Sequence, residues 1–214
     1  MGACWSRLAA WDEGFFWALN KGWINPAADW LMPWISDFLI YAPFLAVLAA
    51  WLLFKAGAKG RWVLAGVVLL LVLTDWTTSH IWRPLIERPR PWTFLEGIHL
   101  FQNGSWTLTD ATSVSKAAVA FGLPSAHASN SLGLAVYLGR FFPGLAWVMV
   151  PVAVLVGLSR VYLGVHFPAD VLLGFAWGGA SGLVAAWAVK RLMARFSPPP
   201  DRKRAGRPDA SVMN

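Results

Sequence analysis

Long apolar runs alternate with short polar stretches along most of this 214-residue chain. A helix needs about 20 mostly apolar residues to cross the hydrocarbon layer of a membrane, where its backbone polar groups must be paired internally. The runs predict an all-α fold, a polytopic membrane helix bundle with about five transmembrane helices. These helices are expected over about 38–54, 62–82, 125–142, 145–162 and 169–193.

The N-terminal part of the chain has a different pattern. Residues 5–34 mix tryptophan, phenylalanine and leucine with charged and amide side chains, which is typical of amphipathic helices that lie in the membrane interface. A sixth spanning helix is the alternative, but the run is interrupted by Asn20, Lys21, Asn25 and Pro26. The expected organisation is an interfacial segment of one or two helices at 1–36, a transmembrane domain at 37–196, and a disordered basic tail at 197–214.

Composition also indicates a membrane protein. Hydrophobic residues make up 57% of the chain and charged residues 14%, whereas soluble domains carry roughly 25% charged residues. The net charge of +7 does not indicate nucleic-acid binding, because seven of the 18 lysines and arginines lie between Lys190 and Arg207, after the last apolar run. Such a tail is expected beside the anionic lipids of the cytoplasmic face. We therefore expect membrane lipids and no nucleic acid among the partners, and the sequence indicates no oligomeric state.

The basic residues predict the orientation of the bundle. Lys55, Lys59 and Arg61 lie between the first two predicted helices. Arg140 follows the third helix, and the basic tail follows the fifth. Five crossings place these regions on one side, which the positive-inside rule makes cytoplasmic. The long polar segment at 83–123 then lies on the outer side, where it is expected to contact substrate.

Three polar clusters lie at helix ends on this outer side. Charged groups near membrane depth are costly, so their clustering indicates a site that binds an ion. Arginine presents a planar fork of donors that matches phosphate oxygens, and the start of a helix presents free backbone N–H groups to an anion. The clusters are Arg83 and Arg90-Pro91 after the second helix; Pro124, Ser125, Ala126 and His127 at the start of the third; and Ser159, Arg160, His166 and Asp170 between the fourth and fifth.

The two histidines in these clusters can supply the reactive groups. A neutral histidine can attack phosphorus, and Asp170 can hold its far nitrogen and stabilise the imidazolium. The other histidine, when protonated, can donate to the leaving oxygen. Each cluster also has a purely structural explanation: interfacial anchoring by arginine, a helix start at Pro-Ser, or a local His–Asp hydrogen bond. Together on one predicted face, the clusters favour phosphate chemistry.

The clusters resemble the tripartite signature of the type 2 phosphatidic acid phosphatase superfamily, which also includes vanadium haloperoxidases. The family pattern is Lys-x6-Arg-Pro, then Pro-Ser-Gly-His, then Ser-Arg-x5-His-x3-Asp. Here Arg83 replaces the lysine of the first motif and Ala126 replaces the glycine of the second, while the third motif matches throughout. The resemblance runs from the second to the fifth predicted helix, which is more than half the chain.

The resemblance implies a lipid phosphatase that uses no metal and no cofactor. His166 would be the nucleophile that forms a phosphohistidine, Asp170 would orient it, and His127 would be the general acid. Arg83 keeps the positive charge of the family's lysine but changes its reach and geometry. The groups implied to bind the phosphoryl oxygens are Arg83, Arg90, Ser125, Arg160 and the backbone N–H of Ala126.

The leading hypothesis is hydrolysis of a prenyl diphosphate such as undecaprenyl diphosphate, at the extracytoplasmic face of a bacterial inner membrane. Lipid A or phosphatidylglycerol phosphate is the alternative substrate within this class. A non-catalytic lipid-binding or transport protein is the alternative of another class, and the presence of His127, His166 and Asp170 argues against it. A soluble haloperoxidase is disfavoured by the apolar helices.

Several other residues carry weaker expectations. Asp75 lies eight residues before Arg83, so an ion pair or support of that arginine is expected, with a proton-relay role as the alternative. Glycines repeat at four-residue spacing in the fifth predicted helix, which favours close helix packing; they are Gly174, Gly178 and Gly182. Four residues in the outer segment either contact a head group or are simply solvated: Glu96, His99, Asp110 and Lys116.

Overall fold

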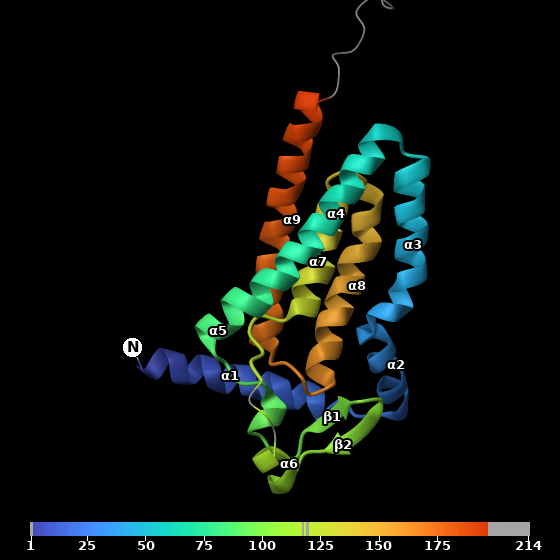
Figure 1. Cartoon of the computed structure of the whole chain (residues 1–214). Coiled ribbons are helices and arrows are strands. Elements are labelled where there is room, and N and C mark those ends of the chain that lie inside the picture. Colours follow the sequence, from blue (N-terminus) through green and yellow to red (C-terminus); the bar gives the residue numbers. More distant parts are fainter. Residues whose placement is uncertain (1, 117, 119, 197–214) are drawn as a thin grey trace, which may run out of the picture.

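The structure is a computed structural model that describes residues 2–116, 118 and 120–196. The predicted basic tail at 197–214 lies outside these residues. Five helices run between the two ends of a bundle (Figure 1), and they correspond to the five helices predicted from the apolar runs. They are α3 (Phe38–Phe54), α4 (Gly57–Thr77), α7 (Ala126–Gly139), α8 (Pro143–Tyr162) and α9 (Pro168–Phe196).

Helix α7 forms the centre of the bundle and packs against α4, α8 and α9. Its closest neighbour is α9, because a Cβ atom on Gly178 would lie 2.0 Å from the backbone oxygen of Ser129. A Cβ on Gly182 would similarly lie 2.5 Å from the backbone oxygen of Gly133. The prediction that the glycines of α9 serve close helix packing is therefore confirmed.

The number of membrane spans differs from the predicted five. Among the described residues, three helical segments are long and apolar enough to cross a membrane: Gly57–Ile86, Pro143–Tyr162 and Pro168–Phe196. A fourth span results if α2 (Pro26–Ser36) and α3, which are bent by 46° at their junction, act as one. Helix α7 has 14 residues, or about 21 Å of helix, which is short of a hydrocarbon core of about 30 Å.

The shortness of α7 has a local cause. Its start is polar, and it ends at Gly139, whereas the apolar run had suggested a helix extending to Phe142. Pro143 begins α8, and the residue before a proline is disfavoured in the helical conformation. The apolar run therefore counted a turn between two helices as part of one helix.

The N-terminal segment forms two helices separated by the predicted polar interruption. Helix α1 (Gly2–Asn20) lies across one end of the bundle (Figure 1), and α2 follows it. Asn25 caps α2, since its side-chain oxygen accepts a hydrogen bond from the backbone N–H of Ala28 at 2.9 Å, and Pro26 takes the first helical position. That these helices lie in the membrane interface remains a prediction.

The segment at 83–123, which was predicted to lie outside and is called the outer segment below, contains a β-hairpin, so the prediction of an all-α fold is wrong in this part. Strands β1 (His99–Gln102) and β2 (Ser105–Leu108) pair antiparallel, with Gln102 opposite Ser105. The two turn residues, Asn103 and Gly104, have positive φ values of 54° and 81°, as a tight hairpin turn requires. The remaining short elements are α5 (Arg83–Ile86), the 3-10 turn η2 (Pro91–Thr93) and α6 (Ala111–Lys116).

A π-helical turn, η1 (Thr78–Trp82), joins α4 to α5 directly before Arg83. Such a turn inserts a residue into the helix and rotates everything that follows, and it is frequent at functional sites. The spacing between Asp75 and Arg83 is therefore not that of a regular α-helix. Asp75 is exposed, and in the described part of the chain it forms no ion pair with Arg83, so the predicted pair is not observed. Its charge nevertheless acts on Arg83, so support of that arginine stays a prediction.

Candidate active site

The three polar clusters meet at one end of the bundle. The end of α5, the start of α7, the end of α8 and the start of α9 all lie at the end that α1 and the hairpin cover (Figure 1). His166 lies between α8 and α9, where the charges of Arg160, Arg90 and Arg83 all act on it. His127 interacts electrostatically with His166 and with the same three arginines. Residues far apart in the sequence thus form one cationic site around two histidines.

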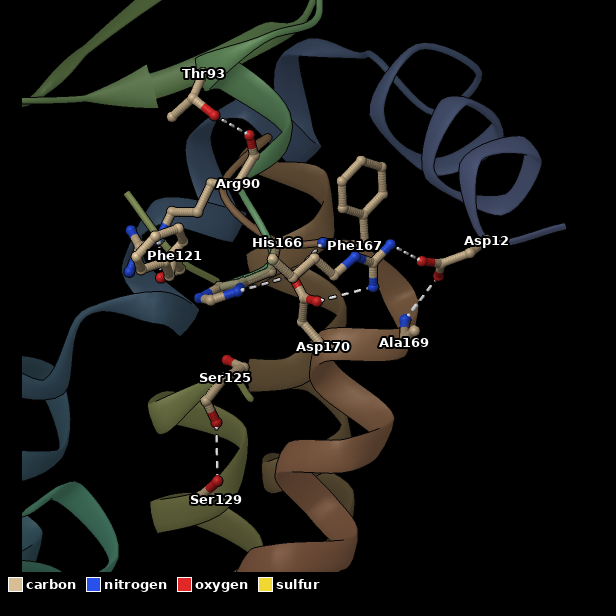
Figure 2. Close-up of polar contacts among 11 residues, drawn as sticks. Asp12, Arg90, Thr93, Phe121, Ser125, Ser129, His166, Phe167, Ala169 and Asp170 are labelled. Atoms are coloured by element: carbon tan, nitrogen blue, oxygen red, sulfur yellow. Dashed lines mark hydrogen bonds and ion pairs between the residues drawn. The ribbon is translucent and has the colours of Figure 1, made fainter. Parts of the chain in front are cut away.

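His166 and Asp170 form a buried pair at the base of this site. Their side chains are 1% and 0% exposed, and Nδ1 of His166 lies 3.3 Å from Oδ2 of Asp170. The same carboxylate oxygen accepts a hydrogen bond from the backbone N–H of Phe167 at 3.0 Å. Figure 2 shows the two side chains facing each other, with Ser125 at the start of α7 nearby. Helix α7 is attached to this pair, because the Ser125 backbone N–H donates to the Asp170 carbonyl oxygen at 2.9 Å.

The surroundings of His166 keep its imidazole neutral. Burial lowers the pKa of His166 well below its usual value, and the charges of Arg160, Arg90 and Arg83 lower it further. Protonation would place a further positive charge in an environment that is already desolvated and cationic. A neutral imidazole has a free lone pair, so His166 is suited to act as a nucleophile.

The arginines and Ser125 hold polar atoms that lack partners. Among the described residues, buried Nε of Arg83, buried Nε of Arg160 and buried Oγ of Ser125 make no hydrogen bond to protein. Buried polar atoms are nearly always paired in folded proteins, and leaving one unpaired is costly. Three such atoms on three predicted phosphate-binding residues indicate a site built to receive an anion.

Arg90 and Arg160 are partly fixed by neighbouring groups. Nε of Arg90 donates to the carbonyl oxygen of Phe121 at 3.3 Å, and Nη1 of Arg160 donates to the hydroxyl of Ser36. Burial, followed by the nearby charge of Arg83, lowers the pKa of Arg90. The guanidinium groups are therefore held close together at the cost of mutual repulsion, which a bound anion would relieve.

The start of α7 presents Ala126 and His127 to the same region. Ser125 is the N-cap residue of α7, but its side chain forms no capping hydrogen bond. The first N–H groups of a helix have no partner within the helix, so the N–H of Ala126 can donate to an anion at this end of α7. His127 is among the exposed residues at the start of α7. Desolvation of its ring and the charges of Arg160, His166, Arg90 and Arg83 lower the pKa of His127 to about 3, so its imidazole is neutral before an anion binds.

Three residues around the site received no role from the sequence. Arg88 pairs with Asp170, and Asp12 of α1 pairs with Arg88. Gly122 lies against the buried pair, because a Cβ atom there would be 2.9 Å from Oδ2 of Asp170 and 3.4 Å from Nδ1 of His166. Arg88 lies in the sequence between Arg83 and Arg90 of the first cluster and could have been suspected from its charge. Nothing in the sequence connects Asp12 or Gly122 to the site.

The outer-segment residues have mainly structural or solvated positions. Nε2 of His99 lies 2.8 Å from Oδ1 of Asp29, and its ring stacks on Trp106 with centroids 4.0 Å apart. Asp110 accepts a hydrogen bond from the N–H of Ser113 at 2.7 Å at the start of α6. Glu96 and Lys116 are exposed.

The model of the PAP2 superfamily matches residues 61–194, which include all three clusters. The chain belongs to the PAP2 superfamily. It is a multi-pass membrane lipid phosphatase, a hydrolase of a family that works without metal.

Two curated relatives and one solved structure support this assignment. A lipid A 4′-phosphatase of Bacteroides thetaiotaomicron is 28% identical over 200 residues, covering 88% of this chain and 83% of the relative. Undecaprenyl-diphosphatase BcrC of Bacillus subtilis is 26% identical over 173 residues, covering 81% of this chain and 77% of the relative. The crystal structure of a transmembrane PAP2-type phosphatidylglycerolphosphate phosphatase from Bacillus subtilis has a TM-score of 0.61 at 22% identity. It covers 91% of this chain and 90% of that chain, which shows a shared fold.

Proposed function

We propose that this PAP2 phosphatase hydrolyses the terminal phosphate of a lipid through a phosphohistidine on His166. The observation that carries the proposal is the buried His166–Asp170 pair beside polar atoms of Arg83, Arg160 and Ser125 that have no partner among the described residues. This arrangement supplies a nucleophile, a group that orients it, and donors for the phosphoryl oxygens.

In the first step, neutral His166 donates from Nδ1 to Asp170 and attacks phosphorus with the lone pair of Nε2. The N–P bond forms as the bond from phosphorus to the lipid oxygen breaks. His127, protonated once the bound anion offsets the arginine charges, donates its proton to that oxygen. In the second step, water attacks phosphorus and passes a proton to His127. The N–P bond then breaks, and inorganic phosphate leaves.

The arginines stabilise the charge that develops on the phosphoryl oxygens. Arg83, Arg90 and Arg160 provide fixed guanidinium donors, while Ser125 and the Ala126 N–H complete the set at the start of α7. Metal ions supply this charge in many other phosphoryl-transfer sites. Here we assign that task to the three arginines.

For the substrate, we propose a prenyl diphosphate such as undecaprenyl diphosphate. In the described residues, Arg83, Arg90 and Arg160 form no ion pair with a carboxylate, so three positive charges are available. A diphosphate carries more negative charge than a phosphomonoester and matches these cations better. Lipid A is the second candidate, because a lipid A 4′-phosphatase is 28% identical over 88% of this chain.

We place the site on the extracytoplasmic side of a bacterial inner membrane, with the C-terminus in the cytoplasm. The support is the positive-inside rule. The α3–α4 and α7–α8 connections lie at the end of the bundle opposite to the α8–α9 connection (Figure 1), and Lys55, Lys59, Arg61 and Arg140 are in or next to the first two connections.

The test is phosphate release by the purified protein from undecaprenyl diphosphate, lipid A and phosphatidylglycerol phosphate in detergent micelles. We expect wild type to release phosphate from undecaprenyl diphosphate, and His166→Ala to release none from any of the three. Activity of His166→Ala equal to wild type would refute the phosphohistidine mechanism. Lipid binding without turnover by wild type would instead favour the non-catalytic alternative.

A further inference from the structure

One face of α1 is directed at the segment that carries the proposed nucleophile. Asp12, Phe16 and Asn20 are four residues apart, so they lie on the same side of this helix. Phe16 and Asn20 are fully buried, and the side chain of Asp12 is 10% exposed. Each of the three contacts a residue close to His166 in the chain.

Asn20 and Phe16 contact the two sides of the loop that contains His166. The Asn20 side-chain amide donates to the carbonyl oxygen of Tyr162 at 2.8 Å. The ring of Phe16 lies 5.2 Å from that of Phe167, measured between centroids. Between them, Gly164 has a φ of +76°, and a Cβ there would lie 3.3 Å from Nδ2 of Asn20. The loop therefore depends on α1 for its conformation.

Asp12 reaches the buried carboxylate through Arg88. Nη1 of Arg88 donates to Oδ1 of Asp170 at 3.0 Å, and Nη2 of Arg88 donates to Oδ2 of Asp12. The other oxygen of Asp12 accepts a hydrogen bond from the backbone N–H of Ala169 at 2.7 Å. Figure 2 shows these contacts, with Asp12 on the far side of Asp170 from His166.

The chain of contacts fixes both oxygens of Asp170. Arg88 occupies Oδ1, which leaves Oδ2 for the imidazole of His166 and the N–H of Phe167. The Arg88 guanidinium also lies over the Phe167 ring, 4.4 Å from its centroid. Its side chain is 27% exposed, so without Asp12 it can turn toward water or toward a bound phosphate.

The burial of Asp170 makes its ion pair with Arg88 energetically important. Ion pairs on protein surfaces contribute little, but a buried charge that loses its partner is strongly unfavourable. The Asp170 side chain is 0% exposed. Any movement of Arg88 therefore changes the position or the charge of the carboxylate that holds His166.

We propose that helix α1 is part of the catalytic apparatus of this phosphatase, and that Asp12 acts through Arg88 to position Asp170 and thereby His166. Asp12 and Arg88 are positioning residues, because neither contacts the phosphate. The inference rests on the proposed role of His166 as the nucleophile. It predicts that a change in the N-terminal helix lowers the rate of the chemical step and leaves substrate binding in place.

The test is a double-mutant cycle on Asp12→Asn, Arg88→Gln and the combined variant. The kcat and KM of each protein are measured on whichever of undecaprenyl diphosphate, lipid A and phosphatidylglycerol phosphate wild type cleaves. Arg88→Gln is expected to lower kcat on the order of 10²-fold, as a misplaced reacting group does, and Asp12→Asn to lower it about 10-fold. The double variant should be no slower than Arg88→Gln, because Asp12 acts through Arg88. KM should change little in all three.

Two further variants separate positioning from folding. Glu13→Gln removes a neighbouring carboxylate that is exposed on the same helix, and it should retain wild-type kcat. Asp12→Glu keeps the charge and should recover most of the activity lost in Asp12→Asn. Additive losses in the cycle, an equal loss in Glu13→Gln, or a rise in KM with kcat intact would overturn the proposal.

The failure of this inference is distinguishable from failure of the proposed function. Exchange of ¹⁸O between inorganic phosphate and water reverses the second step and needs no lipid. We expect wild type to catalyse this exchange, His166→Ala to lose it, and Arg88→Gln to slow it. Loss in His166→Ala with normal exchange in Arg88→Gln and Asp12→Asn would refute only the role of α1. Normal exchange in His166→Ala would refute the nucleophile itself.

Discussion

The charged groups of the site fall into two halves, one in which they are paired with each other and one in which they are not. On one side, Asp12, Arg88 and Asp170 form a continuous series of ion pairs. On the other side, in the part of the chain that the structure describes, Arg83 and Arg160 hold buried nitrogens without partners. The paired half is already satisfied, so it can fix geometry but has no capacity left for a ligand. The unpaired half is satisfied only when an anion arrives, so we assign phosphate binding to it.

The largest expected effect comes from breaking the paired half at its centre. Asp170→Asn keeps the shape of the side chain but removes the charge that pairs with Arg88 and with the imidazolium formed during attack. We expect kcat to fall on the order of 10⁴-fold, by analogy with the buried aspartate of serine-protease triads. Steady-state phosphate release measures this, and an unchanged kcat would show that Asp170 is only a structural residue.

The unpaired half is tested by removing one arginine at a time. Arg160→Ala should lower kcat/KM by about 10²–10³-fold, the range found for single donors that stabilise developing negative charge. Arg140→Ala removes an arginine from the opposite end of the bundle and serves as the control, with activity like wild type. Equal effects of the two variants would mean that general positive charge, and not the local arginine cluster, is responsible.

Gly122 tests how closely the paired half must fit. A methyl group there would lie 2.9 Å from Oδ2 of Asp170, so Gly122→Ala should displace the carboxylate from His166. A loss on the order of 10² in kcat is expected. Gly14→Ala adds a methyl group where no atom lies within 4 Å and should leave kcat unchanged. Wild-type kcat in Gly122→Ala would show that the contact is easily accommodated.

The pH dependence of kcat/KM should show how the arginines of the unpaired half change the pKa of His166, which contacts the paired half. Burial and the charges of Arg160, Arg90 and Arg83 lower the pKa of His166 well below 6.5, and only the neutral form attacks. The protonation of His166 should therefore not reduce kcat/KM until the pH falls well below 6.5. Arg90→Gln removes one of these charges, which raises the pKa of His166 and moves the acid limb of the profile to higher pH. If the acid limb stayed in place, the charge of Arg90 would not be what lowers the pKa of His166.

The smallest effect is expected for Arg83→Lys, which restores the family's lysine. The charge remains, while the planar fork of donors is lost. We expect a change of a few-fold in kcat/KM, in line with the modest difference between single hydrogen bonds. A loss as large as that of Arg83→Ala would show that the fork geometry of this position is required.

Much of this picture could be predicted from the sequence, because it depended on local signals. Apolar runs located the five helices of the bundle, and the motifs singled out residues that the structure brings together: His166, Asp170 and the three arginines. The spacing of Gly174, Gly178 and Gly182 correctly indicated close packing. The hairpin was missed although Asn103-Gly104 is a strong turn signal, since the whole outer segment was treated as one loop.

The rest depended on tertiary structure. Phe141 and Phe142 lie in the turn after α7 but pack in the core of the bundle, so the apolar run extended beyond the helix itself. The pairing of Asp12 with Arg88 joins residues 76 positions apart, and the close approach of Gly122 to Asp170 depends on how the outer segment folds back. The π-turn at Thr78–Trp82 likewise changed the spacing from which an Asp75–Arg83 pair had been expected.

The central claim is that His166 becomes covalently phosphorylated, and trapping that intermediate tests it most directly. Wild-type protein is mixed with undecaprenyl diphosphate, lipid A or phosphatidylglycerol phosphate, quenched in alkali to preserve phosphohistidine, and mapped by mass spectrometry. We predict a phosphoryl group on His166, with more of it trapped in His127→Ala if His127 also assists the water in the second step. A phosphoryl group on another residue, or turnover by His166→Ala, would contradict the account.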